Sequence, residues 1–508
     1  MRQVNHIPAA VLVIAFTLTM AWPKTTAFGA DPAFQVPAGQ RQLFLDDVGI
    51  AKIENLTRTM YQPNKKGAVI RPTYPAESAM QIRCAPAWDP QARLWKIWLT
   101  NSGDYSGTAY AQSKDGLHWT KPSLGQVEVN GTRENSYITI DEKLGWPANA
   151  IMNVVIDPDD PDPARRFKGL GDCTNRHPLI SPDGIHWRKL GVPTITSADE
   201  SNLSYDRQAG MFIATVKGSG PHGRSVHLST SKDFETWTNH GLIFHADDED
   251  QQLGRKAIKA RLADPDFLPP YFKPDPSVFN VDVYNMGIFR YESLYIGMPS
   301  MYHATSRIPN YANTEGFHLV HLASSRDLKN WTRHGDRKPF IGSSQIGNGA
   351  YDLTQILGPS DAVRRGDELW FYYTGLKYRG GWVLEGGKYI PGPGFKPDRD
   401  SGAICLAVLR RDGFMSLDAC EQEGMVLTDP FKLPGGKLFV NVDAVKGELR
   451  VEVLDCKGKV TAQSEPLTGD LLREPVMWAE GNIADLKGQT ASLRFTLRNG
   501  QFYSYWLE

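Results

Sequence analysis

The sequence has no excess of charge of either sign and very few cysteines. It contains 56 lysines and arginines against 57 acidic residues, so the formal net charge is −1. Such a balance provides no basic field for nucleic acid or for an anionic membrane surface, and we expect neither as a partner. The five cysteines are odd in number and widely scattered, with neither a disulfide framework nor zinc spacing. We therefore expect mostly buried free thiols, with one pair as the alternative, and no metal site and no cofactor.

The one long apolar run stands at the start of the chain. It extends from Ile7 to Trp22, follows Arg2, and precedes small residues that fit a cleavage site at Thr25 to Ala27 or at Ala30. The run is too short to span a membrane comfortably. We predict that residues 1–30 are a signal peptide, that the protein is exported to the periplasm or beyond the cell, and that it has no membrane span.

Turn-forming and aromatic residues are abundant. The chain has 47 glycines and 34 prolines, and aromatic residues make up 10% of it. Many turns combined with many aromatic residues favour short strands over long helices. The composition therefore predicts an all-β protein.

One short motif recurs along the chain. The stretch "SKDGLHW" (113–119) has the form Ser-x-Asp-Gly-x-x-Trp, and related stretches end at Trp187, Trp237 and Trp331. A degraded fifth copy keeps Asp412 and Gly413. Aspartate can accept backbone N–H bonds in such a turn, glycine tolerates positive φ, and tryptophan packs between neighbours. Five equivalent copies favour a structural turn over a catalytic motif.

The segments around each copy share a pattern. An aromatic strand precedes each motif, as in "RLWKIWLT" and "ELWFYYTG", and a further strand and a polar turn come before it. Four antiparallel strands repeated five times predict a five-bladed β-propeller over residues 31–433. After "LPGGKL" the strands become short and alternating, as in "LFVNVDAV" and "LRFTL". This pattern predicts a small β-sandwich over residues 434–508.

These features together resemble a known superfamily. The repeats, "LFLDD" near the start, "GDELWFYYTG" and the "LFVNVDA…LRFTL" tail are similar to the superfamily of glycoside hydrolase families 32 and 43. The resemblance covers nearly the whole chain after residue 30. The Trp-Met-Asn-Asp-Pro, Arg-Asp-Pro and Glu-Cys boxes of family 32 are missing from this sequence. The resemblance thus implies a glycosidase with a five-bladed propeller, without fructan specificity.

Candidate catalytic acids lie where one predicted blade crosses to the next. Cleavage of a glycosidic bond needs two carboxyl groups, one protonated and one ionised. The crossovers offer Glu77, Asp199, Asp282 and Asp352. We predict Glu77 or Asp282 as the general acid, and Asp199 or Asp352 as the ionised partner. Glu200 is interpreted as a structural acid.

Candidate sugar-binding residues lie in loops at the same predicted end of the propeller. Aromatic rings can stack on sugar faces, while arginine and histidine can bind carboxylate or sulfate substituents. The predicted binding residues are Arg176, His177, His222, Arg224, His303 and Trp382. Their character points to a carbohydrate partner, with an anionic sugar as one form of it.

Three functions remain open on the sequence. The first is an exported glycoside hydrolase, exo-acting on oligosaccharides derived from a polysaccharide. The second is a glycan phosphorylase in which Arg176, His177, His222 and Arg224 hold phosphate. The third is a non-catalytic sugar-binding propeller, since a fold does not define an activity.

Overall fold

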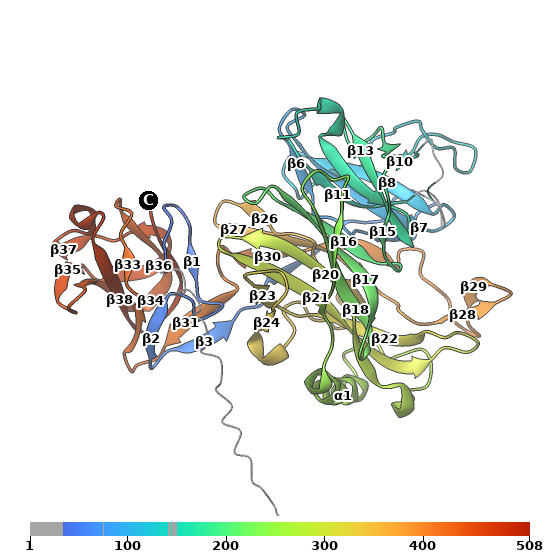
Figure 1. Ribbon diagram of the computed structural model, residues 1–508. Coiled ribbons are helices and arrows are strands. Elements are labelled where there is room, and N and C mark those ends of the chain that lie inside the picture. Colours follow the sequence, from blue (N-terminus) through green and yellow to red (C-terminus); the bar gives the residue numbers. More distant parts are fainter. Residues whose placement is uncertain (1–33, 75, 141–143, 145–149) are drawn as a thin grey trace, which may run out of the picture.

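The computed structural model of the chain describes residues 34–74, 76–140, 144 and 150–508. Most of the regular elements in this part of the chain are β-strands (Figure 1). The predicted all-β class is confirmed. The predicted signal peptide, residues 1–30, lies outside the described residues. Within the described part of the chain there is one α-helix, α1 (Asp248–Ala263). The short 3₁₀ helices are η1 (Pro163–Arg165), η2 (Pro276–Val278), η3 (Gly335–Arg337) and η4 (Ile483–Leu486).

Three groups of antiparallel strands form separate sheets, here called units two, three and four. Unit two contains β11 (Ile151–Ile156), β12 (Phe167–Gly171), β13 (Asn175–Ser181), β14 (Arg188–Lys189) and β15 (Ile195–Thr196). Unit three contains β16 (Ser201–Asp206), β17 (Met211–Gly220), β18 (Gly223–Ser231) and β19 (Thr238–Phe244). Unit four contains β20 (Asn280–Tyr291), β21 (Leu294–Arg307), β22 (Thr314–Val320), β23 (Ala323–Ser325) and β24 (Thr332–Arg333).

Units one and five are joined in a single sheet. Unit one contains β5 (Ala79–Gln81), β6 (Ala87–Asp89), β7 (Leu94–Ser102), β8 (Gly107–Ser113), β9 (Trp119–Thr120) and β10 (Tyr137–Ile138). Unit five contains β25 (Gln355–Leu357), β26 (Val363–Arg365), β27 (Glu368–Leu376) and β30 (Gly402–Arg410). Its fourth strand is β4 (Asn64–Ile70), which comes from the beginning of the chain and pairs antiparallel with β30.

The repeated motif forms one turn in four copies, with the same serine and aspartate bonds in each, while the Trp237 indole of the third copy has no hydrogen-bond partner in the described part of the molecule. In the second copy, Asp183 accepts hydrogen bonds from the backbone N–H groups of Ile185 and His186, while the hydroxyl of Ser181 accepts one from Gly184. The indole of Trp187 then donates to the carbonyl of Gly184. Gly184 has a φ of 80°. The predicted structural role of the aspartate and glycine is confirmed.

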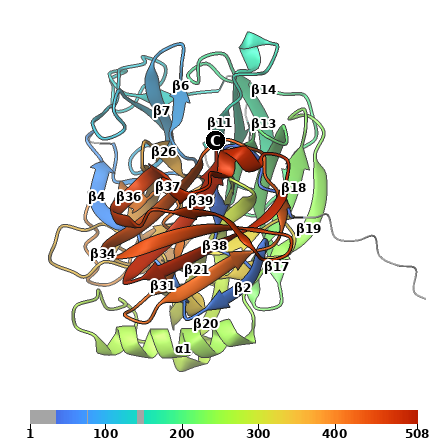
Figure 2. The ribbon, with the colours of Figure 1, turned by 90° about the vertical axis from the view of Figure 1, so that its left-hand side faces the viewer.

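The C-terminal strands form a sheet that also takes strands from both sides of the units (Figures 1 and 2). Three come from the beginning of the chain: β1 (Gln42–Leu43), β2 (Ile50–Glu54) and β3 (Thr57–Met60). Three more follow unit five: β31 (Met415–Ala419), β32 (Gly424–Thr428) and β33 (Phe431–Lys432). The others are β34 (Leu438–Asp455), β35 (Val460–Ser464), β36 (Leu467–Pro475), β37 (Trp478–Glu480), β38 (Thr490–Arg498) and β39 (Gly500–Leu507).

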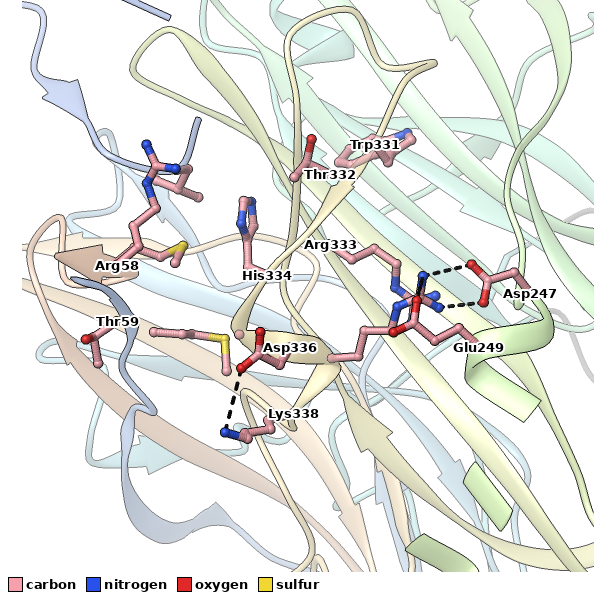
Figure 3. Close-up of a pocket in the computed structure, with 15 residues that line it drawn as sticks. Arg58, Thr59, Asp247, Glu249, Trp331, Thr332, Arg333, His334, Asp336 and Lys338 are labelled. Carbon is pink, nitrogen blue, oxygen red and sulfur yellow. Dashed lines mark hydrogen bonds and ion pairs between the residues drawn. The ribbon is translucent and has the colours of Figure 1, made fainter. Parts of the chain in front are cut away.

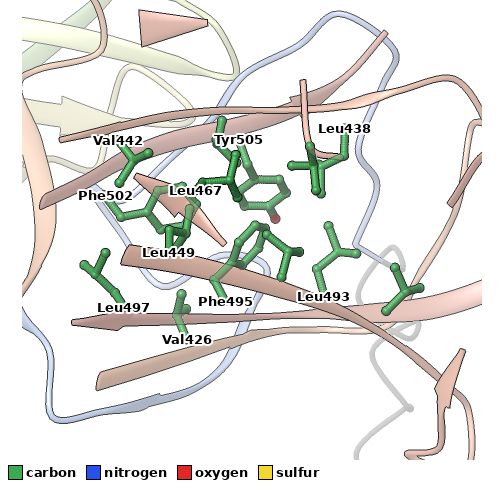
Figure 4. Close-up of a cluster of buried hydrophobic side chains, with 14 of the residues drawn as sticks. Val426, Leu438, Val442, Leu449, Leu467, Leu493, Phe495, Leu497, Phe502 and Tyr505 are labelled. Atoms are coloured by element: carbon green, nitrogen blue, oxygen red, sulfur yellow. The ribbon is translucent and has the colours of Figure 1, made fainter. Parts of the chain in front are cut away.

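This sheet encloses a hydrophobic core of its own. The long strand β34 pairs with β39 through its first half and with β38 through its second half, so that it belongs to both sides of the core. Figure 4 shows Val442, Leu449, Phe495 and Phe502 facing one another between these strands, all of them buried. The alternation of apolar and polar residues in the tail is thus explained by one face on a core and one on solvent.

Two insertions depart from the four-strand pattern. Helix α1 lies between units three and four and packs on β20, where Gln251 exchanges hydrogen bonds with the backbone of Val281. The hairpin of β28 (Trp382–Glu385) and β29 (Lys388–Pro391) extends from unit five, at the side of the molecule away from the C-terminal sheet (Figure 1). All five cysteines are unpaired; Cys420 and Cys456 are exposed, which differs from the buried thiols expected.

Candidate functional site

The first strands of the units meet at the centre of the molecule. The amide of Asn153 in unit two donates to the carbonyl of Arg83 in unit one (2.7 Å) and to that of Ser201 in unit three (2.9 Å). The amide of Asn202 in unit three in turn donates to the hydroxyl of Ser360 in unit five (2.6 Å). Polar bonds between neighbouring first strands therefore tie the units together at this point.

A group of charged and aromatic residues lies above this junction, and we call it the central cluster. Its side chains interact electrostatically or through ring contacts with one another. The members are Arg83, Asp199, Glu200, Lys217, Arg224, Asp282, Tyr284, Tyr302, His318 and Arg379.

Asp199 and Glu200 are adjacent in the chain but differ in surroundings. Glu200 is buried and holds Arg83 with both carboxylate oxygens, one of them 2.7 Å from the Arg83 Nη2 atom. Asp199 keeps 61% of its side chain exposed and lies 2.7 Å from the Nζ atom of Lys217. The pair with Arg83 occupies both oxygens of Glu200, whereas Asp199 stays open to solvent. The sequence-based interpretation of Glu200 as structural agrees with this placement.

Asp282 lies on β20 and is almost fully buried. Its Oδ2 atom accepts a hydrogen bond from Arg224 Nε (2.8 Å), while its Oδ1 atom has no hydrogen-bond partner. Gly223 makes room for this carboxyl group, because a Cβ atom there would lie 3.1 Å from Oδ2. Gly223 also has a φ of 114°, a conformation that other residues adopt with strain.

The environments of Asp199 and Asp282 move their pKa values in opposite directions. Burial raises the pKa of Asp282 and outweighs the opposing attraction of Arg224. For Asp199 desolvation acts upward, but the charge and hydrogen bond of Lys217 outweigh it, so that the pKa of Asp199 is lowered. Lys217 acts on both carboxyl groups. The two predicted acids are therefore brought into one cluster, where the pKa of one is raised and the pKa of the other is lowered.

Aromatic rings form one wall of the cluster. The Tyr284 ring lies 3.7 Å from the Lys217 Nζ atom, and the Tyr302 ring lies 4.4 Å from the Arg224 guanidinium. His318 contacts both tyrosine rings and is fully buried, and burial lowers its pKa well below the usual value. Both tyrosines are buried, and Lys217, Arg224 and Arg379 lie over their rings, so the rings support the cations of the cluster.

The other two predicted acids lie away from Lys217 and Arg224. Asp352 is buried against Lys65 (2.7 Å) and the hydroxyl of Tyr373 (2.9 Å). Glu77 accepts hydrogen bonds from Lys121 (2.6 Å) and from the backbone N–H of Thr73 (2.6 Å), and its side chain has no exposed surface. In the part of the chain that the structure describes, all the hydrogen bonds to Glu77 end on its Oε2 atom, and its buried Oε1 atom has no partner.

Of the predicted binding residues, only Arg224 lies in the central cluster. Arg176 is fully buried and donates to Ser201 (2.7 Å) and to the carbonyl of Ala198 (2.9 Å). His303 is also buried, stacked on Phe317 at 4.8 Å between ring centres, and burial lowers its pKa to about 4.

The remaining three predicted binding residues are at the surface. His177 and His222 lie 3.9 Å from Asp172 and 3.3 Å from Asp248, respectively. Trp382 is 36% exposed and lines a small hollow together with Glu77. This hollow also contains Asp104 and Arg399.

Several members of the cluster escaped the sequence-based prediction. Arg83 and Lys217 lie inside strand-like segments, where a single cation carries no pattern that marks it as functional. Tyr284 follows Asp282 by two residues, and side chains two apart on a strand share a face. That spacing was the one signal in the sequence that could have placed Tyr284 beside Asp282. Arg379 lies in the loop after β27, three residues before the hairpin begins at Trp382, and no motif distinguishes it.

A larger groove lies elsewhere, between the C-terminal sheet and unit four (Figure 3). It measures about 750 Å³ and is lined by Arg58, Trp331, His334 and Arg337 among others. Its charges are paired: Arg337 bonds both carboxylate oxygens of Asp247 at 2.5 and 2.9 Å. Among the residues that the structure describes, those lining the groove include none of the predicted site residues.

Metal and membrane features were examined over the same residues. Within residues 34–74, 76–140, 144 and 150–508 there is no group of three or more histidines, cysteines or acids arranged to hold a metal ion. In this part of the chain no helix is both long and apolar enough to cross a membrane.

Comparison with known proteins gives structural matches only. No protein-family model matches the chain, and no curated protein sequence does. A Bombyx mori beta-fructofuranosidase of glycoside hydrolase family 32, in complex with sucrose, shares 10% identity at a TM-score of 0.40 over 87% of this chain and 94% of that one. The alpha-L-arabinofuranosidase from Podospora anserina shares 9% at 0.39, over 69% and 98%. An N-acetylgalactosamine deacetylase from F. plautii shares 13% at 0.40, over 70% and 96%.

Proposed function

We propose that the protein is an exported glycoside hydrolase that acts on oligosaccharides derived from a polysaccharide. In this proposal the five strand units are the blades of a propeller, and the central cluster is the bottom of its funnel. The observation that carries the proposal is the placement of two carboxyl groups around one lysine, with the pKa of the buried Asp282 raised and that of Asp199, 2.7 Å from Lys217, lowered. Such a pair matches what glycosidic cleavage requires.

The two carboxyl groups have distinct roles in the proposed reaction. Asp282 gives its proton to the glycosidic oxygen as the bond from that oxygen to the anomeric carbon breaks. Asp199 either removes a proton from the attacking water or attacks the anomeric carbon itself, depending on the distance between the two carboxyl groups around the substrate. Arg224 holds Asp282 in place, and the buried rings of Tyr284 and Tyr302 pack against Lys217 and Arg224.

Exo-action is the finer part of the proposal. The hairpin of β28 and β29 stands beside the cluster, and the hydroxyl of Tyr389 on the hairpin lies 2.6 Å from that of Tyr311 in unit four. A hairpin fixed in this way would block one side of the site, so that the end of a polymer chain could enter and its middle could not. Helix α1 packs on β20, where the Gln251 side chain donates a hydrogen bond to the carbonyl of Val281.

Replacement of the two acids tests the proposal. We expect Asp282→Asn and Asp199→Asn each to lower sugar release from a panel of plant and algal oligosaccharides by at least about 100-fold, with an unchanged circular dichroism spectrum. Asp352→Asn is the matched control, because this acid is enclosed by Lys65 and Tyr373; its activity per folded molecule should stay within a few-fold of the wild type. Full activity in both cluster variants would refute the assignment.

The two other functions make different demands on the same residues. A phosphorylase would need free phosphate-binding groups, but Arg176 is bonded to protein, and His177 and His222 lie beside Asp172 and Asp248. Of the four residues considered, only Arg224 lies in the cluster. A sugar-binding protein without catalysis would bind oligosaccharides of the panel and release no product.

A further inference from the structure

We propose that the central cluster recognises a negatively charged substituent of the sugar, a carboxylate or a sulfate ester, through Arg379. This inference rests on the proposed carbohydrate function and names the class of substrate within it. The feature behind it is the ion pairing in the cluster: within the described part of the chain, three of its four cations have an acid as partner, and Arg379 does not.

Each of the other three cations of the cluster has its own acid. Arg83 pairs with Glu200, Lys217 with Asp199, and Arg224 with Asp282. Arg379 differs: no carboxylate among the described residues lies within ion-pair distance of it. Its Nε atom is buried and makes no hydrogen bond. A buried donor without a partner costs free energy, which a bound acceptor would recover.

The protein holds Arg379 in the cluster without neutralising it. Its guanidinium lies over the Tyr302 ring at 5.5 Å, the same ring that contacts Arg224. Burial raises the pKa of Glu315 and the nearby charge of Arg379 opposes the rise, but Glu315 makes no ion pair with Arg379: it accepts hydrogen bonds from the backbone N–H groups of Tyr271 (2.7 Å) and Phe272 (2.8 Å). Lys377, two residues before Arg379, bonds Asp398. Arg379 is therefore the cation that remains available to a ligand.

The shape of this group selects the ligand chemistry. A guanidinium presents planar donors that match a carboxylate or a sulfate with two parallel hydrogen bonds. Within the ranges that the structure describes, Lys217 and Arg224 are already paired with Asp199 and Asp282, so Arg379 is the member of the cluster that offers an unpaired guanidinium. A neutral sugar at this position would leave the Arg379 charge unpaired, so the arrangement discriminates in favour of an acidic sugar.

The test compares matched pairs of oligosaccharides. The probes are a uronate-containing oligosaccharide and its carboxyl-reduced form, and a sulfated oligosaccharide and its desulfated form. Binding is measured by calorimetry, or as KM where the probe is turned over, and product release is recorded separately. We expect the wild type to prefer one charged member of a pair over its neutral counterpart by at least about tenfold, less so at high salt.

The variants assign the preference to Arg379. Arg379→Met should weaken binding of the charged probe by about 10- to 100-fold and leave the neutral probe within about threefold. The affinity of Arg379→Lys for the charged probe should lie between that of the wild type and that of Arg379→Met. Arg188→Met, which removes an exposed arginine on the outer strand β14, is the control and should change neither.

The outcomes separate this inference from the proposed hydrolase. Equal affinity for charged and neutral probes, or equal loss of both in Arg379→Met, would overturn the anionic substrate while leaving hydrolysis untouched. Tight binding of a charged probe without release of product would support anion recognition by Arg379 and contradict the proposed hydrolase activity. Preference for the carboxylate pair or for the sulfate pair decides between the two substituents. Binding of none of the four probes would overturn the inference.

Discussion

The acids and cations of the cluster show how context decides the role of a single residue. Glu200 and Asp199 are neighbours in the sequence, yet one is closed by Arg83 and the other faces solvent. The sequence could indicate which crossovers carry acids. It could not indicate which cation each acid would meet, because Arg83 and Lys217 come from other strands. In the sequence Asp352 and Asp282 both stand at crossovers and could not be told apart. In the structure Asp352 contacts Lys65, whereas Asp282 contacts Arg224.

The pH dependence of activity should depend on Arg224. A general acid works only while protonated, so activity falls as the pH rises through the pKa of Asp282. Burial raises this pKa and Arg224 opposes the rise. In Arg224→Met the opposing attraction is gone, the pKa rises further, and the alkaline limb of the kcat profile should move to higher pH. Arg224→Lys keeps the charge and should leave the limb near its original position. A limb that stays fixed or moves to lower pH in Arg224→Met would contradict the role of Asp282.

At the scale of elements, the repeated turns were the most predictable part of the chain. Their aspartates, glycines and tryptophans determine a local bond pattern that needs no distant partner, and the structure has that pattern in four copies. Two copies lack the glycine and place Phe234 and Leu328 at a φ of 64° and 66° instead. Long-range pairing was harder to predict: β1, β2 and β3 join the C-terminal sheet through residues more than 300 positions away.

The turn aspartates should contribute to acid stability. Desolvation acts upward on the pKa of Asp233, but hydrogen bonds from the backbone of Thr236 and Glu235 lower it to about 2, and the pKa of Asp327 is lowered to about 2 in the same way. A lowered folded-state pKa gives stability that is complete above the unfolded value of about 4 and is lost as the pH falls through about 2.

We therefore expect the double variant Asp233→Asn, Asp327→Asn to be less stable than the wild type at pH 7. Each asparagine keeps an acceptor oxygen but lacks the charge, so the free energy of unfolding of this variant should also fall less between pH 4 and pH 2. Urea unfolding at several pH values measures both effects. Parallel curves for the two proteins would show that these aspartates do not contribute in this way.

On the scale of the whole molecule, the C-terminal sheet and the units are interwoven. The division predicted from the sequence, into residues 31–433 and 434–508, follows the change in strand pattern and stays a prediction. Strands on both sides of residue 434 contribute to the core beneath β34, among them β32 with Val426 and β38 with Phe495. A buried contact joins the two parts as well, since Arg41 stacks on Trp506 at 3.7 Å.

Expression of residues 31–433 alone tests how independent the first part is. Without β34, β38 and β39 this fragment exposes apolar side chains such as Phe44, Leu417 and Val426, and we expect it to aggregate. Co-expression with residues 434–508 should restore a soluble complex that elutes at the size of the whole chain. A fragment that is monomeric and stable by size-exclusion chromatography and circular dichroism would show that the propeller folds without the sheet.

The pairing of β4 with β30 also sets an order of events during synthesis. Residues 64–70 are made early, but the strand that binds them spans residues 402–410 and is translated after every other unit. Until then β4 has an open edge, and contacts between distant segments form slowly. Until residues 402–410 have been made, the edge of β4 therefore stays unpaired and open to association with other strands.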